Sequence, residues 1–150
     1  VRMMDEDGNA MELDNAQMEF AYRDSRAHRE NMVILGATFQ LYPEDEQQVL
    51  ANIADFTKRR NEKQPLMYAS AGSTFKRPEG HFAAKLIDDA GLKGKGLGNA
   101  QVSEMHAGFI VNKGGATASE VLKLIEYVQR EVREQFDVEL CPEVRILGEE

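Results

Sequence analysis

The stretch AQVSEMHAGFIVNKGGATASEVLKLIEYVQREV, residues 100–132, decides the fold class. Two apolar segments, 100–103 and 108–112, are separated by a short turn and predict two strands. Thr117 and Glu120 then have the spacing of a capping box, in which the hydroxyl and the carboxylate satisfy each other's free backbone N–H groups. The helix that follows carries four apolar residues on one stripe: Val121, Leu124, Val128 and Val132. Because strands and helices are mixed without a strict βαβ period, the predicted fold class is α+β.

A short helix and a glycine-rich loop precede this stretch. Apolar residues spaced by four predict the helix over 82–90, with Gly91 as its C-cap. The loop over 91–98 contains four glycines with Lys93 and Lys95. It lacks the P-loop spacing and the strand–loop–helix context of a dinucleotide-binding fingerprint. A surface turn is therefore favoured over a phosphate-binding loop.

The start of the chain predicts a small sheet. Two apolar patches over 1–13 flank a turn rich in Asp, Gly and Asn, which is typical of a hairpin. Residues 14–30 are polar and irregular, and the apolar run 32–41 predicts a buried strand. Since apolar residues follow Val1 at once, as they would inside a strand, we expect the chain to be a piece of a longer protein.

A helix and a break come next. Pro43 and the acidic residues after it predict a helix start, because proline suits the first turn and acids suit the positive end of the dipole. The helix carries one apolar face: Val49, Leu50, Ile53 and Phe56. The segment 61–65 breaks the pattern, so we divide the chain into one lobe over 1–61 and a second over 62–150.

Composition excludes several classes of function. The chain has 150 residues, 18 Lys and Arg against 26 Asp and Glu, and a formal net charge of −8, which argues against binding to nucleic acid or to an anionic membrane. No apolar run approaches the roughly 20 residues that cross a bilayer. A single cysteine, Cys141, excludes an internal disulfide framework, favours a reducing cytoplasm and is expected to be packed. The three histidines are scattered, so no metal site is predicted.

Polar groups after the predicted break could carry chemistry. In the segment 71–78, AGSTFKRP, a Gly–Ser turn would let the hydroxyl of Ser73 approach a ligand, and Lys76 and Arg77 could bind an anion. No His/Asp pairing marks Ser73 as an acyl-transfer nucleophile, but it could donate a proton beside a cation. A plain polar turn is the alternative.

Two further candidates lie near the ends of the chain. A last strand is expected over 137–147, with Pro142 marking an edge, a bulge or a rim. Side-chain alternation places Glu143 and Arg145 on one face of it, where a surface ion pair is the alternative to a functional role. Arg23 precedes the apolar run 32–41, and its guanidinium could bind a carboxylate or phosphate or pair with Asp24.

Together these pieces resemble one family. Tyr22-Arg23-Asp24-Ser25, then the segment 71–78, then Ala100-Gln101-Val102-Ser103 with His106 and residues 109–112, and finally Pro142-Glu143-Val144-Arg145 occur in the order seen in UDP-N-acetylenolpyruvoylglucosamine reductases. Each piece alone is a weak motif, but four in order are specific. The resemblance covers residues 17–148.

The resemblance implies a reaction. NADPH would reduce FAD, and UDP-N-acetylglucosamine enolpyruvate would be converted to UDP-N-acetylmuramate in peptidoglycan precursor synthesis. Ser73 would protonate the enolate carbon, while Arg23 and Glu143 would flank the substrate and stabilise that intermediate.

The resemblance also implies what surrounds this site. Arg145 would contact the electron-rich edge of the flavin or orient Glu143, and Lys76 and Arg77 would bind substrate, although some members have asparagine at the position of Arg77. Members run to about twice this length. Residues 1–61 would therefore be the end of the FAD-binding lobe and 62–150 the substrate-binding domain, with the N-terminal FAD-binding half of the same protein as partner.

Two other functions stay open on the residues alone. The chain could be a non-catalytic α+β module that binds a nucleotide-sugar or a protein through the loop over 91–98. It could also be a purely structural assembly domain, which would bind no UDP-sugar.

Overall fold

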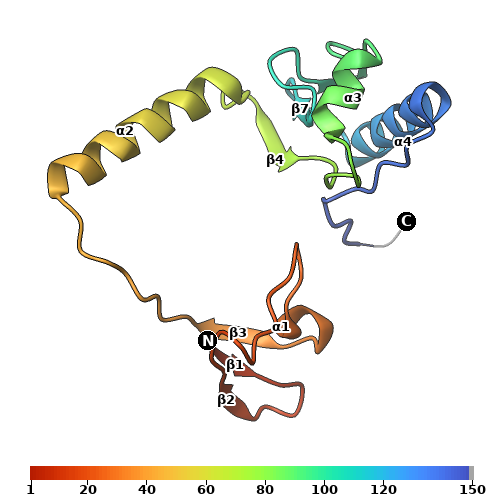
Figure 1. Ribbon diagram of the computed structural model, residues 1–150. Coiled ribbons are helices and arrows are strands. Elements are labelled where there is room, and N and C mark those ends of the chain that lie inside the picture. Colours follow the sequence, from red (N-terminus) through yellow and green to blue (C-terminus); the bar gives the residue numbers. More distant parts are fainter. Residues whose placement is uncertain (149–150) are drawn as a thin grey trace. The chain divides into compact units, whose positions relative to one another are not determined.

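The computed structural model describes residues 1–148 and divides into two compact units, one over Val1–Asp45 and one that begins at Glu46 (Figure 1). The division falls at the start of the long helix rather than at residue 61. The predicted boundary at residue 61 concerns function, namely where a flavin lobe gives way to a substrate domain, and it stays a prediction.

The first unit is built on a three-stranded antiparallel sheet with strand order β2-β1-β3. Its strands are β1 (Arg2–Met4), β2 (Ala10–Glu12) and β3 (Val33–Gly36). The carboxylate of Asp5 accepts a hydrogen bond from the backbone N–H of Asn9 at 2.8 Å, which closes the turn between β1 and β2. The predicted hairpin over 1–13 is therefore confirmed.

The core of the first unit is small. Met3, Leu13, Met18 and Ala27 form one buried cluster. Ala27 belongs to a single helical turn, α1 (Arg26–Arg29), inside the segment 14–30 that was expected to be irregular.

The predicted buried strand over 32–41 is wrong in length and in burial. Only β3 forms within it, and Val33, Ile34 and Leu35 are exposed, as are Phe39 and Leu41 beyond the strand. The physical reason is position, because β3 is an edge strand and the core of this unit gathers around Met3 of the central strand.

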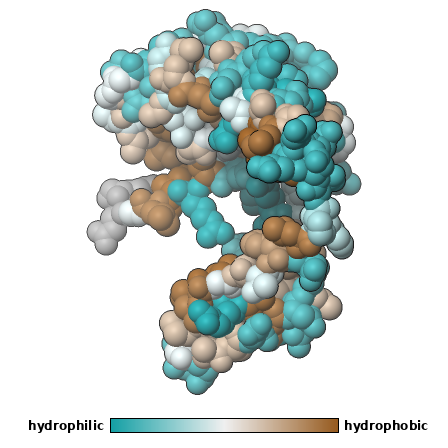
Figure 2. Space-filling view, turned by 90° about the vertical axis from the view of Figure 1, so that its left-hand side faces the viewer, coloured by the Kyte–Doolittle hydropathy of each residue, from teal (hydrophilic) through white to brown (hydrophobic). Residues whose placement is uncertain are grey.

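Helix α2 (Glu46–Lys63) opens the second unit. The predicted helix after Pro43 is confirmed, but it continues to Lys63 and ends just before Pro65, which disfavours helical backbone in the residue before it. No residue of α2 is buried, and its predicted apolar face is exposed. Figure 2 shows hydrophobic side chains, coloured brown, at several places on the surface of the chain.

A four-stranded antiparallel sheet with order β4-β7-β6-β5 forms the centre of the second unit. Its strands are β4 (Ala69–Ser73), β5 (Gly96–Leu97), β6 (Ala100–Val102) and β7 (Phe109–Asn112). The two strands expected over 100–103 and 108–112 are confirmed, and the predicted surface turn 91–98 contains β5. With antiparallel sheets and helices combined, the α+β prediction is confirmed.

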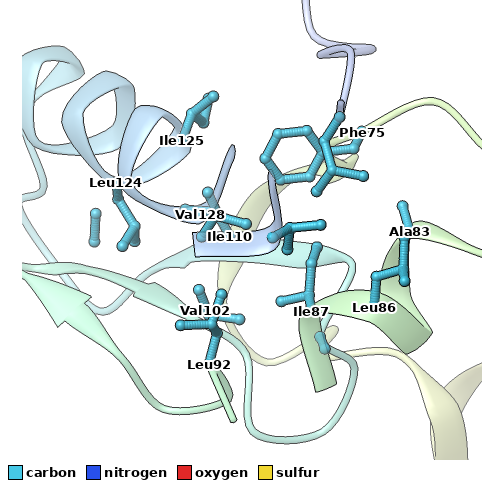
Figure 3. Close-up of a cluster of buried hydrophobic side chains, with 14 residues drawn as sticks. Phe75, Ala83, Leu86, Ile87, Leu92, Val102, Ile110, Leu124, Ile125 and Val128 are labelled. Atoms are coloured by element: carbon cyan, nitrogen blue, oxygen red, sulfur yellow. The ribbon is translucent and has the colours of Figure 1, made fainter. Parts of the chain in front are cut away.

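Two helices cover one face of this sheet. Side chains of α3 (Ala83–Asp89) and α4 (Ala118–Phe136) point toward Val102 and Ile110, and together they form the main core (Figure 3). The capping box of α4 is present, because the Thr117 hydroxyl accepts from the backbone N–H of Glu120 at 3.2 Å and Glu120 accepts from that of Thr117 at 2.9 Å. The apolar stripe of α4 is buried at Leu124, Ile125, Val128 and Val132, with Val121 half-buried.

The predicted last strand over 137–147 is wrong. Asp137 ends α4 with a left-handed backbone (φ 55°), and the only pairing in the described part of this segment is a single bridge between Phe75 and Pro142. The N–H of Thr74 donates to the carbonyl of Gly108 and not to Glu143, so the pairing does not extend to a second bridge on that side. Leu140 beside it is fully buried in the main core, whereas Cys141 is exposed, which corrects the expectation that it packs.

Candidate functional site

Ser73 lies at the end of edge strand β4, where the strand is irregular. The register with β7 shifts between Ser70 and Ser73, and Gly72 has a positive φ of 83° that favours glycine. The predicted turn over 71–73 is therefore the bulged end of a strand. A bulge re-aims the side chain beside it, and Ser73 is exposed.

Glu143 is brought next to Ser73 by two backbone hydrogen bonds. The N–H of Glu143 donates to the carbonyl of Thr74 at 2.8 Å, and the N–H of Lys76 donates to the carbonyl of Cys141 at 2.8 Å. These bonds flank the bridge at Pro142. Residues about 70 positions apart in the chain thus become neighbours, with Glu143 half-buried.

Thr74 anchors this junction, and the sequence analysis did not identify it. Its side chain is 3% exposed, and its hydroxyl accepts a hydrogen bond from the N–H of Ile110 at 3.1 Å. Its own N–H donates to the carbonyl of Gly108 at 2.8 Å. In the sequence, Thr74 is only a threonine between a serine and a phenylalanine. The fold is needed to show that its hydroxyl accepts from the N–H of Ile110.

A hollow of about 460 Å³ lies beside Ser73. It is lined in part by Arg60 of α2, Gln64 directly after that helix, Tyr68, and Ser70 of β4. The volume lies within the usual range of small-molecule sites, roughly 300–1,000 Å³. We call this space the Ser73 hollow.

The two predicted anion-binding residues lie three and four positions after Ser73. Lys76 and Arg77 are both exposed. The guanidinium of Arg77 lies over the ring of Phe82, 3.9 Å from its centroid, and its Nε donates to the carbonyl of His81 at 3.3 Å. Arg77 is thus held by a cation–π contact rather than extended freely into solvent.

Arg145 is exposed and contributes to the lining of a second hollow of about 520 Å³ between β4, β7 and α4. Most of that lining is apolar. Since 137–147 is not a strand, the alternation that placed Glu143 and Arg145 on one strand face has no basis in the structure.

Arg23 belongs to the first unit, where it sits in a tight turn closed by the bridge between Ala21 and Asp24. Its φ is 57°, and its guanidinium lies 5.8 Å from the ring centroid of Tyr22. The Asp24 carboxylate accepts from Arg29 at 2.6 Å and lies 3.2 Å from Nδ1 of His28, and these bonds lower the pKa of Asp24. The structure therefore brings the backbone of Glu143 alongside the end of β4 at Ser73, while a common site for the side chains of Ser73, Glu143 and Arg23 stays a prediction.

Other kinds of site have no geometric support in the described residues. Within 1–148, no three His, Cys, Asp or Glu side chains are grouped as a metal ion would require. No helix in the same range has the length and apolar character of a membrane span. His106, part of the family resemblance, packs edge-to-face on Phe109, and its Nδ1 accepts from the N–H of Gly108 at 3.2 Å.

Comparison with known proteins gives a consistent result. A family model described as UDP-N-acetylenolpyruvoylglucosamine reductase, C-terminal domain, matches residues 64–147. The reductase of that name from Clostridium botulinum strain 657 is 55% identical over 149 residues, which are 99% of this chain and 49% of the relative. The one from Clostridium kluyveri is 54% identical over 143 residues, covering 95% and 47%.

Solved structures agree. The crystal structure of the UDP-N-acetylenolpyruvylglucosamine reductase from Thermus caldophilus superimposes with a TM-score of 0.77 at 32% identity, over 93% of this chain and 49% of that one. The chain thus spans about half the length of the relatives it matches.

Proposed function

Since this chain belongs to the UDP-N-acetylenolpyruvoylglucosamine reductase family, we propose that it is the C-terminal half of an enzyme that reduces UDP-N-acetylglucosamine enolpyruvate to UDP-N-acetylmuramate. In this reaction a hydride and a proton add across the enolpyruvyl double bond. NADPH is the reductant and FAD the bound carrier. The observation that supports the proposal is the 2.8 Å bond from the N–H of Glu143 to the carbonyl of Thr74, because it holds the backbone of Glu143 alongside the residue that follows Ser73.

Ser73 is the proposed acid. After the hydride has added to one carbon of the double bond, the electron pair rests on the other carbon as an enolate conjugated to the carboxylate. The Ser73 hydroxyl donates its proton to that carbon and is left as an alkoxide. The backbone of Ser73 is paired with β7 at the bulged end of the edge strand, and its side chain is exposed. A hydroxyl on a fixed backbone that substrate can reach suits this role.

Glu143 and Arg23 are the proposed stabilisers of the enolate. Negative charge on the carboxyl oxygens needs hydrogen-bond donors fixed in advance. The guanidinium of Arg23 supplies them as a cation. Glu143 flanks the substrate, and its half-buried position restricts the solvent that reaches the intermediate.

Lys76 and Arg77 are the proposed substrate anchors. They follow Ser73 along the same loop, and both are exposed. Their charges suit the diphosphate and carboxylate of the substrate. Because Arg77 is held on Phe82, its guanidinium is already positioned before an anion arrives.

Binding of the flavin is assigned mainly to the N-terminal half of the full-length protein. When bound, it supplies the hydride chemistry. Of the described residues, Arg145 is the proposed contact. Arg145 is exposed at the lining of an apolar hollow, where its guanidinium would donate hydrogen bonds to the electron-rich edge of a bound flavin.

The N-terminal half of the same protein is the proposed partner. Apolar side chains of β3 and of α2, among them Ile34, Ile53 and Phe56, are more than half exposed in this chain. Soluble proteins rarely leave contiguous apolar patches uncovered. The relatives have as much chain again outside the matched region, enough to cover these faces. We place the whole enzyme in the cytoplasm, where NADPH is available.

The test uses the full-length protein that contains this chain. Rapid mixing with NADPH measures reduction of the flavin, and a second mixing with the enolpyruvyl substrate measures its reoxidation. We expect Ser73→Ala to leave flavin reduction within twofold and to slow reoxidation by about 10²–10⁴-fold, the usual contribution of a general acid. Ser70→Ala is the matched control, because Ser70 is an exposed serine of the same strand and hollow.

Two results would contradict the proposal. Equal effects of Ser73→Ala and Ser70→Ala on reoxidation would remove Ser73 from the chemistry. No oxidation of NADPH by any version would favour the non-catalytic module, which would still bind a UDP-sugar.

A further inference from the structure

A basic hollow lies between the β5–β6 hairpin and helix α4. Its volume is about 380 Å³, and three cations line it: Lys95, Lys123 and Arg130. The lining holds no carboxylate, although the chain as a whole carries a net charge of −8. We call this space the α4 hollow.

Regular structure positions these cations around a hollow whose lining also includes the apolar residues Leu97 and Leu124. Lys123, Tyr127 and Arg130 follow one another at helical spacing on one side of α4, with Leu124 below them. Lys95 enters from the hairpin, where its carbonyl accepts from the N–H of Val102 at 2.8 Å. The backbone on both sides of the hollow is therefore fixed by regular structure.

Two of the three cations make no ion pair with the described residues. Among residues 1–148, neither Lys95 nor Lys123 makes an ion pair, whereas Lys93 of the same loop is bound to Asp88 at 2.7 Å. Arg130 is 3.2 Å from Glu131 and lies over the ring of Tyr127, 5.2 Å from its centroid. The hollow thus offers two ammonium groups outside any ion pair and a guanidinium that lies over a phenol ring.

We propose that the α4 hollow binds a nucleoside polyphosphate, with the phosphates on Lys95 and Lys123 and the base against Tyr127 and Arg130. Ammonium groups act as point charges for phosphate oxygens. Aromatic rings and guanidinium planes both stack on nucleobases. None of these residues lines the Ser73 hollow, so the α4 hollow is a second site that does not depend on the proposed reductase activity.

The test measures binding by calorimetry, with ADP and inorganic pyrophosphate as probes for the whole 150-residue chain. We expect saturable binding of ADP, and we expect Lys95→Gln/Lys123→Gln to weaken it at least tenfold. Tyr127→Leu should weaken ADP binding and leave pyrophosphate binding within twofold. The charge-matched control is Lys58→Gln/Lys63→Gln, which removes two exposed cations of α2 and should leave the ADP affinity within twofold.

Circular dichroism checks that each variant is folded. All four substituted cations are exposed, so each variant should keep the spectrum of the parent. Lys95→Arg/Lys123→Arg, which retains both charges, should retain ADP binding. The proposal would be overturned by the absence of saturable ADP binding, by equal losses in the two charge-removing pairs, or by a Tyr127→Leu effect that is the same for ADP and pyrophosphate.

Discussion

Thr74→Val is the substitution that tests the junction between Ser73 and Glu143 most specifically. Valine has nearly the shape of threonine and is more apolar, so on burial alone it would stabilise the protein. In this structure, however, the hydroxyl of Thr74 accepts the N–H of Ile110 at 3.1 Å, and both residues are buried. Valine leaves that amide without a partner, which costs about 1–3 kcal/mol.

Thr74→Ser is its matched control, because serine keeps the acceptor and loses only a methyl group, worth about 0.8 kcal/mol. Urea unfolding of the 150-residue chain should therefore give a lower free energy of unfolding for Thr74→Val than for Thr74→Ser. Amide hydrogen exchange should show the loss directly, with faster exchange at Ile110 in the valine variant only.

The opposite order would refute the reasoning. If Thr74→Val is as stable as the parent chain, or more stable than Thr74→Ser, the hydrogen bond to Ile110 contributes nothing and the junction is held by packing alone.

Three further predictions concern separate parts of the fold. Thr117→Ala removes the hydroxyl of the capping box and should lower the free energy of unfolding by about 0.5–2 kcal/mol in urea, whereas Thr117→Ser should not. Leu140→Ala truncates a fully buried side chain next to the Glu143 segment and should cost about 2–5 kcal/mol, with Leu147→Ala, at an exposed position, near zero. The hydrogen bonds from Arg29 and His28 hold the pKa of Asp24 below its ordinary value of 3.8. The stabilisation they give is therefore present above pH 3.8 and is lost as the pH falls through the folded-state pKa. NMR titration of the Asp24 carboxyl should show that low pKa, and Arg29→Gln should raise it.

Features set by neighbouring residues were predictable from the sequence. The capping box, the hairpin over 1–13 and the two central strands join residues close together in the chain, and the apolar stripe of α4 follows from helical periodicity. Local sequence patterns are therefore sufficient to predict these features.

Features set by tertiary position were not predictable in the same way. The apolar run 32–41 has the composition of a buried strand, yet β3 is an exposed edge. The alternating segment 137–147 has the pattern of a strand, yet it forms one bridge only, because the N–H of Thr74 that would extend the pairing donates to Gly108. In both cases the pattern describes the side chains, while the outcome depends on which backbone lies alongside.

The candidate site follows the same rule. The family resemblance selected Ser73 and Glu143 one by one from their local motifs. Their proximity depends on a bond from Glu143 to Thr74 across about 70 residues, and the buried anchor at Thr74 has a role that no local pattern indicates.

A double-mutant cycle in the full-length protein tests most directly whether these two residues act on one intermediate. The measured quantity is the rate of flavin reoxidation by the enolpyruvyl substrate in the parent, in Ser73→Ala, in Glu143→Gln and in the double variant. Residues that act as a unit are strongly non-additive, so we predict a double variant about as slow as the slower single one. Rate losses that simply multiply would mean that Ser73 and Glu143 act independently, and the proposed shared site would be wrong.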